Sequence, residues 1–263
     1  MSDSSETLVE LGVANHVATI TLNRPARLNA IDLPMAEALL REIRAVGAEA
    51  DVHALVISGR GRAFSAGGDL VAIGELIDRR DWGAARRLLE LGRDIVVTLR
   101  TMPKAVIAAV NGPAMGAGAS LALACDMRIA SGEAVFGLPF TRLGLHPDWG
   151  ACYFLPRIVG AGRATELILS GRTIDAVEAE RLGLFHRTVP ATGLLDEAYR
   201  LAASLTQLPA EAVILAKRTV EQSFHSTLED LLEIEVQRQL HCLQTAGARQ
   251  AISAFTSRPA RGG

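Results

Sequence analysis

A short buried strand, a glycine-rich loop and the start of a helix follow one another twice in this sequence. The first unit runs through Ala54–Ser58, the loop Gly59–Gly68 and a helix opening at Asp69. The second runs through Ala105–Val110 and the loop Asn111–Gly118 into a helix of small residues. Short apolar runs that end in glycine are typical of strands covered on both faces. This repeated order predicts an α/β fold assembled from similar units.

Other strands and helices surround the repeated unit. Strand-like runs occur at Thr7–Leu11 and His16–Leu22, and Asp32-Leu33-Pro34 is typical of a helix start. After residue 150 helical spacing dominates, and only His186–Val189 has the pattern of a strand. We therefore predict an α/β core over residues 1–190.

The remaining residues, 191–263, are predicted to form a helical C-terminal region. Its segment Leu228–Leu243 carries apolar side chains at helical spacing, which a small tail cannot bury by itself. Unburied apolar surface of this kind marks an interaction site. We therefore expect this region to pack on another subunit.

Charge and composition disfavour several classes of partner. The 27 basic and 29 acidic residues leave a net charge of -2, which provides no field for a long polyanion, so no nucleic-acid partner is expected. The apolar run Ala105–Val110 is interrupted at once by Asn111-Gly112-Pro113, so no membrane span is expected. The first six residues are polar and acidic, unlike a secretory signal, and the three cysteines lack metal-ligand spacing. These features predict a cytoplasmic protein without a metal site.

The two glycine-rich loops are candidates for a ligand site made of main chain. Such loops expose backbone N–H groups at a helix start, which suits a phosphate or another anion. Neither loop contains the GxxxxGK[ST] or GxGxxG pattern of phosphate loops, and either loop alone is explained equally well as a tight turn. Two loops at equivalent positions favour another interpretation, in which their N–H groups converge on one carbonyl oxygen that becomes an oxyanion.

Both loops resemble the signature segments of a known family. Phe64–Leu70 (FSAGGDL) and Ala108–Gly118 (AAVNGPAMGAG), closing with Ala124-Cys125-Asp126, are similar to the paired motifs of the crotonase, or enoyl-CoA hydratase/isomerase, family. Asn23–Ala30 is similar to the family's N-terminal CoA-binding segment. The resemblance extends from about Thr7 to Arg258.

The resemblance implies a spiral of ββα units with a helical trimerisation region, assembled as a homotrimer or a dimer of trimers. It implies an acyl-CoA thioester as the ligand, with no cofactor beyond the CoA that the substrate carries. By position, the backbone N–H groups of Ala66 and Ala117 form the oxyanion hole. Many relatives have glycine at the second position, and a main-chain donor tolerates alanine there. The C-terminal region is also expected to act as a lid over the CoA site.

Several further residues match positions that bind CoA or line the acyl pocket in relatives. For an individual arginine, a solvated surface charge is an equally good explanation. The strip implied for CoA comprises Arg24, Ala26, Arg27, Leu28, Ser65, Gly67, Asp69 and Arg258, and the implied substrate pocket comprises Met115, Ser120, Phe140 and Trp149.

The acid–base residues decide the reaction, because one oxyanion hole serves hydration, isomerisation, dehalogenation and thioester hydrolysis. The family's hydratases use two glutamates, and this sequence has Ser120 and Phe140 at those positions. Asp148 lies eight residues after Phe140 in the run LGLHPDWG. This run resembles the Leu-Gly-Leu-x-Pro-Asp segment of the ring-epoxide and β,γ-enoyl-CoA isomerases of bacterial phenylacetate breakdown. Flanking Phe140 and Trp149 are expected to desolvate Asp148 and raise its pKa, as a base requires. The alternative is that Asp148 caps the following helix, and neighbouring His146 is expected at the surface.

We predict an isomerase in which Asp148 moves a proton between two carbons of a β,γ-unsaturated or ring-epoxide acyl-CoA. Three alternatives stay open: an enoyl-CoA hydratase with atypical acid–base residues, an aryl-CoA dehalogenase or thioesterase, and a CoA-binding scaffold without chemistry. In a dehalogenase, Asp148 is the nucleophile. The histidine that dehalogenases carry has no counterpart in Trp82–Arg100, which disfavours that interpretation.

Overall fold

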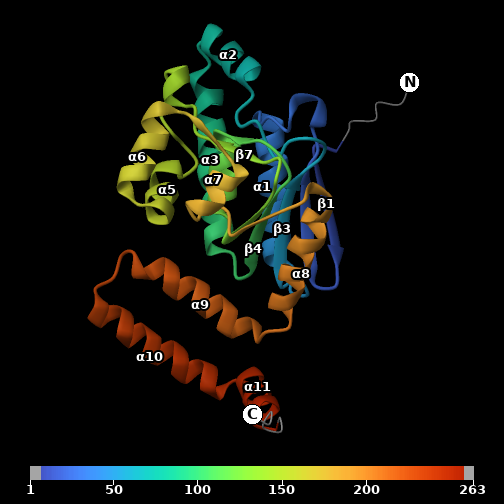
Figure 1. Ribbon diagram of the computed structural model, residues 1–263, viewed down its shortest axis with the longest axis vertical. Coiled ribbons are helices and arrows are strands. Elements are labelled where there is room, and N and C mark those ends of the chain that lie inside the picture. Colours follow the sequence, from blue (N-terminus) through green and yellow to red (C-terminus); the bar gives the residue numbers. More distant parts are fainter. Residues whose placement is uncertain (1–6, 258–263) are drawn as a thin grey trace.

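The computed structural model describes residues 7–257, which form a layered α/β core with a separate group of C-terminal helices (Figure 1). The predicted contact of Arg258 with CoA lies outside the described residues. The strands are β1 Val9–Ala14, β2 Val17–Leu22, β3 Ala54–Gly59, β4 Ala105–Val110, β5 Ala114–Met115, β6 Met127–Ser131, β7 Val135–Gly137, β8 Thr173–Asp175 and β9 Arg187–Val189. The helices are α1 Leu33–Ala48, α2 Leu70–Asp78, α3 Trp82–Thr101, α4 Ala117–Ala124, α5 Ala151–Val159, α6 Ala161–Ser170, α7 Ala176–Arg181, α8 Leu194–Thr206, α9 Ala210–Ser223, α10 Leu228–Gln244 and α11 Ala246–Thr256.

The main sheet has six strands in the order β1-β2-β3-β4-β6-β9. Only the β1–β2 pair is antiparallel, and every later pair is parallel. All six residues of β4 are buried, as the unbroken apolar run predicts for a strand covered on both faces. Its side chains alternate between two clusters: Val106 faces the core that contains α1 and α3, and Ile107 faces the core that contains α8.

A second, small sheet places the loops that follow the main strands. Its order is β5-β7-β8, so β5 continues from β4 and β7 continues from β6. The chain thus steps from the large sheet to the small one in successive units. This mixed α/β architecture agrees with the predicted spiral. β5 and β8 were not predicted, because segments of two and three residues are too short to show a period.

Helix α1 begins as the sequence predicts. The Asp32 carboxylate accepts a hydrogen bond from the N–H of Met35 at 3.0 Å, and Pro34 lies in the first turn, where it lacks only an N–H that has no helical partner. The buried face of α1 packs along α3. Both helices therefore cover one face of the sheet.

The described part of the predicted C-terminal region, residues 191–257, contains helices in two kinds of surroundings. Helix α8 packs on the sheet through Leu194, Ala198 and Ala202, so it belongs to the core. Helices α9, α10 and α11 have no buried residue and project away from the core, with α10 folding back beside α9 (Figure 1). Helix α8 thus differs from α9–α11, because its apolar side finds a partner within the chain.

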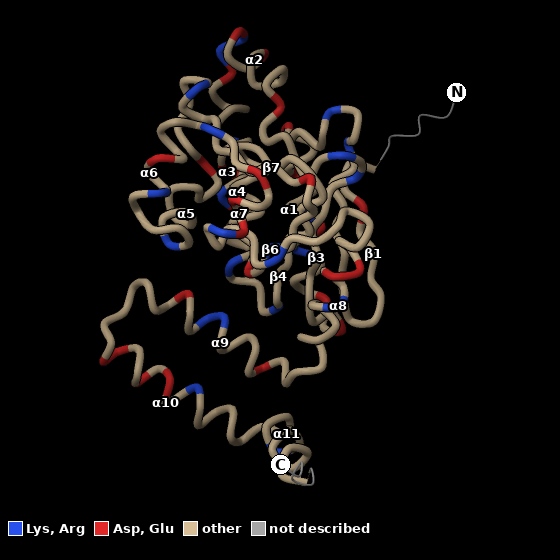
Figure 2. Tube along the Cα trace, in the orientation of Figure 1, with Lys and Arg blue, Asp and Glu red and all other residues tan. Residues whose placement is uncertain are grey.

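Ion pairs fasten α9 to the core. The Lys217 ammonium lies 2.7 Å from the Asp126 carboxylate, which also accepts from Arg100 at 3.2 Å and from the backbone N–H of Val106 at 2.9 Å. Arg100 in turn pairs with Glu221 of α9. Asp126 therefore has a structural role. Figure 2 shows basic and acidic residues interspersed along the chain. None of the helices within residues 7–257 is long and apolar enough to span a membrane.

Candidate active site

The two glycine-rich loops interlock backbone to backbone. The N–H of Ser65 donates to the carbonyl of Pro113 at 3.2 Å, and the N–H of Met115 donates to the carbonyl of Ser65 at 2.9 Å. A Cβ atom on Gly67 would lie 2.5 Å from the Met115 carbonyl oxygen, and one on Gly118 would lie 2.5 Å from the Ser65 carbonyl oxygen. Each loop therefore needs a glycine where the other approaches, and Gly67 also has a φ of +89°.

The interlocked loops bring the two predicted oxyanion donors to one place. Ala117 is the first residue of α4, and its N–H has no hydrogen-bond partner within residues 7–257. The N–H of Ala66 donates to the carbonyl of Leu28 at 2.9 Å. One donor is thus available, whereas the other already serves an internal acceptor with which a thioester oxygen must compete.

Ala66 and Ala117 both line a cavity of about 510 Å³. Helices α2 and α3 form an apolar wall, and the segment between β7 and α5 closes the other side. This volume falls in the range of pockets that enclose drug-sized ligands. The lining residues are Ile31, Ala66, Gly68, Leu70, Ile73, Leu76, Ile77, Trp82, Ala85, Leu88, Leu89, Gly116, Ala117, Pro139, Phe140, Leu143, Leu145, His146, Asp148 and Trp149.

Asp148 carries the only carboxylate among the described residues that line this cavity. Its Oδ1 atom is buried and has no hydrogen-bond partner in the described structure. Burial raises the pKa of the Asp148 carboxyl to about 6, against the lowering effects of its own backbone N–H and of His146. Helix α5 is capped by Gly150 without a side-chain hydrogen bond, so Asp148 does not cap it. A carboxylate with a raised pKa and a buried, unpaired oxygen in the cavity that Ala66 and Ala117 also line has the environment of a general base.

The structure brings some of the predicted pocket residues to the cavity and leaves others outside. Phe140 and Trp149 line it beside Asp148. Ser120 does not, because it is fully buried and its hydroxyl donates to the Gly116 carbonyl one turn earlier, at 3.1 Å. The Met115 side chain packs against Gly137 of the small sheet, so it also lies outside the lining.

Three residues of the strip predicted to bind CoA have side chains that hold the chain together. Arg24 lies 2.8 Å from Asp69 and 3.0 Å from Asp32, and Asp69 also caps α2 through the N–H groups of Val71 and Ala72. The Ser65 hydroxyl donates to the Asn29 carbonyl at 2.8 Å. These side chains have internal partners, and their contact with CoA stays a prediction. Exposed Ala26 and Arg27 and partly exposed Leu28 keep accessible surface.

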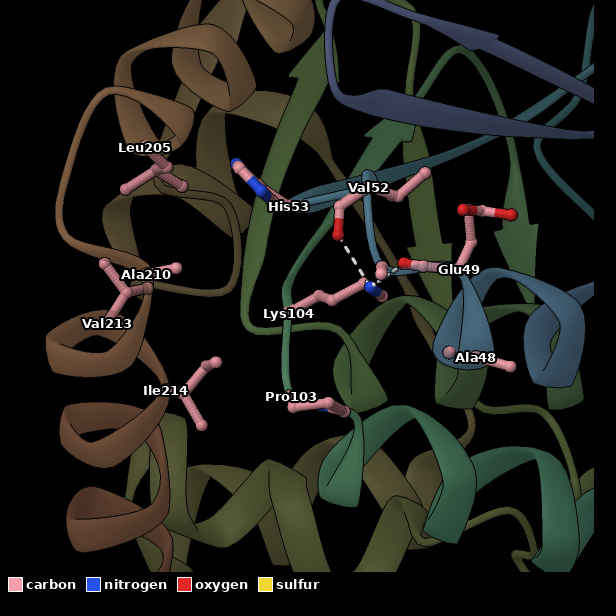
Figure 3. A pocket seen from close by; sticks show the side chains of 12 residues that line it. Ala48, Glu49, Val52, His53, Pro103, Lys104, Leu205, Ala210, Val213 and Ile214 are labelled. Atoms are coloured by element: carbon pink, nitrogen blue, oxygen red, sulfur yellow. Dashed lines mark hydrogen bonds between the residues drawn. The ribbon is translucent and has the colours of Figure 1, made fainter.

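A second cavity of about 280 Å³ lies at the other end of the sheet, between the end of α1 and the start of α9 (Figure 3). Its lysine, Lys104, donates to the carbonyl oxygens of Glu49 and Val52 at 2.6 Å each. Burial lowers the pKa of Lys104. The ammonium is thus directed at the main chain, and Figure 3 shows mostly apolar side chains around it. Of these two cavities in the described chain, the one at the glycine loops combines a backbone donor with an unpaired carboxylate.

Comparison with known proteins identifies the family of the chain. The sequence profile of the family described as Enoyl-CoA hydratase/isomerase matches residues 12–260. The chain belongs to the enoyl-CoA hydratase/isomerase family. EchA12 of Mycobacterium tuberculosis is 39% identical to it over 246 residues, which cover 90% of this chain and 86% of that protein. The short-chain-enoyl-CoA hydratase of Clostridium acetobutylicum is 34% identical, with 91% and 90% covered. The crystal structure of the enoyl-CoA hydratase from Bacillus anthracis superposes with a TM-score of 0.90 at 33% identity, covering 95% of this chain and 96% of the other.

The apolar wall of this member of the enoyl-CoA hydratase/isomerase family was not predicted from the sequence. Leu70, Ile77 and Trp82 line the cavity, although 55%, 51% and 61% of their surfaces are exposed. The available signal was α2 itself, a mostly apolar helix that has no buried residue. Such a helix has to meet a ligand or a partner. His146, expected at the surface, is exposed and yet lines the cavity.

Proposed function

We propose that this protein isomerises a β,γ-unsaturated or ring-epoxide acyl-CoA, as the branch of the family active in phenylacetate breakdown does, with Asp148 as the single proton-transferring residue. The observation that carries the proposal is the buried, unpaired Oδ1 of Asp148 in the cavity that Ala66 and Ala117 also line. The paired-glutamate hydration mechanism lacks its residues, because Ser120 and Phe140 occupy those positions.

The proposed reaction needs one carboxylate and two N–H groups. The Asp148 carboxylate removes a proton from C2 of a 3-enoyl-CoA, and the electron pair moves onto the thioester oxygen. The N–H groups of Ala117 and Ala66 stabilise this dienolate, the latter in competition with the Leu28 carbonyl. Protonated Asp148 then returns the proton to C4, which gives the 2-enoyl-CoA and restores the carboxylate. The proton stays with the substrate and the carboxylate is regenerated, so the proposed reaction needs no cofactor beyond the CoA of the substrate.

The acyl group that we propose is large and apolar. Apart from Asp148 and His146, the cavity wall consists of apolar side chains and loop backbone, and α2 supplies exposed apolar residues to it. Apolar surface of this extent favours a long-chain or ring-containing acyl group over a four-carbon one, because each additional buried CH₂ contributes roughly 0.8 kcal/mol of transfer free energy.

A panel of acyl-CoAs tests the reaction. Hydration is the second candidate, because the relatives from Clostridium and Bacillus are named hydratases. Purified protein should convert 3-enoyl-CoAs to 2-enoyl-CoAs faster than it hydrates crotonyl-CoA, with the rate rising for larger apolar acyl groups. Preferred hydration would establish the second candidate, and halide release from a halo-aryl-CoA would indicate the dehalogenase. Tight binding without turnover of any substrate would indicate a scaffold.

The proposed base gives the reaction a defined pH dependence. Because Asp148 acts as a base, it has to be ionised in the free enzyme, and its pKa is about 6. The kcat/KM for isomerisation is therefore expected to fall as the pH drops through about 6 and to level off above about 7. A pH–rate profile of kcat/KM measures this midpoint. A midpoint near the ordinary aspartate pKa of about 4 would contradict a desolvated base.

We also propose that the chain assembles as a homotrimer or a dimer of trimers through α9–α11. Leu228, Leu232, Val236 and Leu240 recur every four residues on α10, and about half or more of the surface of each is exposed. Within one chain these side chains have no core to join.

The double variant Leu232→Asp/Leu240→Asp is expected to convert the assembly to monomers, because two carboxylates would have to be desolvated at each interface. Light scattering coupled to size-exclusion chromatography measures the mass. The control is Gln239→Asp, which adds one negative charge at an exposed polar position of the same helix. An unchanged mass for the double variant would show that α10 does not form the interface.

A further inference from the structure

Helix α3 has a notch at Gly92, which is filled by the side chain of Trp149, the neighbour of the proposed base Asp148. Gly92 lies in the middle of the buried face of α3. A Cβ atom at this position would overlap Nε1 and Cε2 of the Trp149 indole and lie 2.6 Å from its Cδ1. Glycine is unfavourable inside a helix, so its presence here is explained by the ring that lies directly on the helix backbone.

Trp149 has a backbone conformation that needs external support. Its φ is +50°, in the left-handed region that bulky residues rarely adopt, and the next residue, Gly150, has a φ of +81°. The two residues reverse the chain between Asp148 and the start of α5. Only 7% of the Trp149 surface is exposed, so the packing of its buried ring can hold this chain reversal in place.

The same packing connects the apolar wall with Asp148. Ala85, Leu88 and Leu89 of α3 line the cavity, and Gly92 follows on that side of the helix three and four residues after Leu89 and Leu88. Asp148 directly precedes Trp149, and its Oδ1 is buried without a partner. No hydrogen bond in the described structure orients that oxygen, so its direction depends on the backbone that the indole holds.

We propose that Gly92 is a positioning residue, whose notch seats the Trp149 indole and thereby aims the Asp148 carboxylate into the cavity. This inference rests on the proposed function of Asp148 as the base. Gly92 touches neither substrate nor reacting atoms, and it acts through Trp149.

The variant Gly92→Ala tests the notch with one methyl group. It is expected to lower kcat for isomerisation about a hundred-fold, because small misplacements of a reacting group have effects of this size, while KM changes little. The matched control is Gly83→Ala in the same helix, where a Cβ would meet only Asp81 Oδ1 at an ordinary 3.5 Å. This control should keep the wild-type kcat.

Two further readouts separate positioning from general damage. An ejected indole exposes Asp148 to water, so the midpoint of the kcat/KM profile should move from about 6 toward the ordinary value of roughly 4. The second readout is tryptophan emission in a Trp82→Phe background, in which Trp149 is the only tryptophan. Gly92→Ala should shift this emission to longer wavelength and increase its quenching by acrylamide, whereas Gly83→Ala should change neither.

A double-mutant cycle with Trp149→Leu decides whether the effect passes through the indole. Leucine lacks the two ring atoms that the new methyl group would overlap. Trp149→Leu alone should lower kcat, and adding Gly92→Ala should lower it no further; this holds even if Gly92→Ala alone folds poorly. Additive losses, or unchanged pH midpoint and emission in Gly92→Ala, would overturn the positioning role. Retained activity in Asp148→Asn would instead refute the proposed function, and the emission would still report whether the notch seats the ring.

Discussion

The variant Asp148→Asn is expected to lower kcat for isomerisation of a 3-enoyl-CoA by about 10³- to 10⁴-fold, with KM nearly unchanged. An amide cannot take the proton from C2, and the cavity lining offers no second carboxylate among the described residues. The apolar wall and both loop donors remain, so binding of the thioester should persist. Stopped-flow or coupled assays give kcat, and calorimetry with a non-reacting acyl-CoA gives Kd.

The same variant should be more stable than the wild type at neutral pH. Native Asp148 has a pKa of about 6 in place of 3.8, so between these values the native state binds more protons than the unfolded state. The stabilisation that the native state gains from protonated Asp148 therefore falls as the pH rises through this window, and it is lost in full above the window. Ionised Asp148 thus destabilises the fold by up to about 3 kcal/mol at about pH 8. Replacing the carboxylate by the neutral amide relieves this cost, and the difference in stability should vanish at about pH 4.

Urea denaturation near pH 4 and near pH 8 measures that difference. A variant that loses activity and gains stability only at high pH identifies a buried charge kept for function. Loss of activity together with loss of stability at both pH values would instead assign Asp148 a structural role. Full activity would remove Asp148 from the mechanism.

Helices and strands with an unambiguous local pattern of apolar residues were predictable from the sequence. The bounds of β4 agree residue for residue, because an unbroken apolar run between polar neighbours leaves no other register. The segment Leu228–Leu243, which has helical spacing, agrees with α10 to within one residue. The relation between the two loops was also predictable, because each follows a parallel strand and leads to a helix.

Side-chain partners across long sequence separations were not predictable. Arg24 and Asp69 match positions for CoA, and only the folded chain shows that they pair with each other. Ser120 shows the same limit. From the sequence its hydroxyl could point into the pocket or donate to the preceding helical turn, and in the structure it donates to the turn. The Leu28 carbonyl that accepts from Ala66 depends on left-handed backbone at residues 28 and 29, with φ values of 52° and 56°. The residue types at these two positions do not require left-handed backbone, so the sequence does not predict this hydrogen bond.

The interlocked loops predict the second large effect, a loss of dienolate stabilisation in Gly67→Ala. The added methyl group would lie 2.5 Å from the Met115 carbonyl oxygen and 3.1 Å from the Ala117 nitrogen, in backbone that cannot rotate away. The loops must separate, so the proposed joint contact of the Ala66 and Ala117 N–H groups with the thioester oxygen is lost. Loss of one such donor costs about 10²- to 10³-fold in kcat, and we expect a decrease of this size with little change in KM.

The control for this variant is Gly183→Ala, which isolates the backbone conformation from the contact between the loops. Gly183 has a φ of +77°, close to that of Gly67, and a Cβ there meets nothing within 4 Å. Both variants should lose roughly 1 kcal/mol of stability to the left-handed conformation, but only Gly67→Ala should lose kcat. Because the methyl group leaves Asp148 untouched, the pH midpoint of its residual activity should stay at about 6. Equal kcat values for the two variants would show that the contact between the loops does not set the geometry of the donors, whereas a shifted midpoint would place the damage at the base.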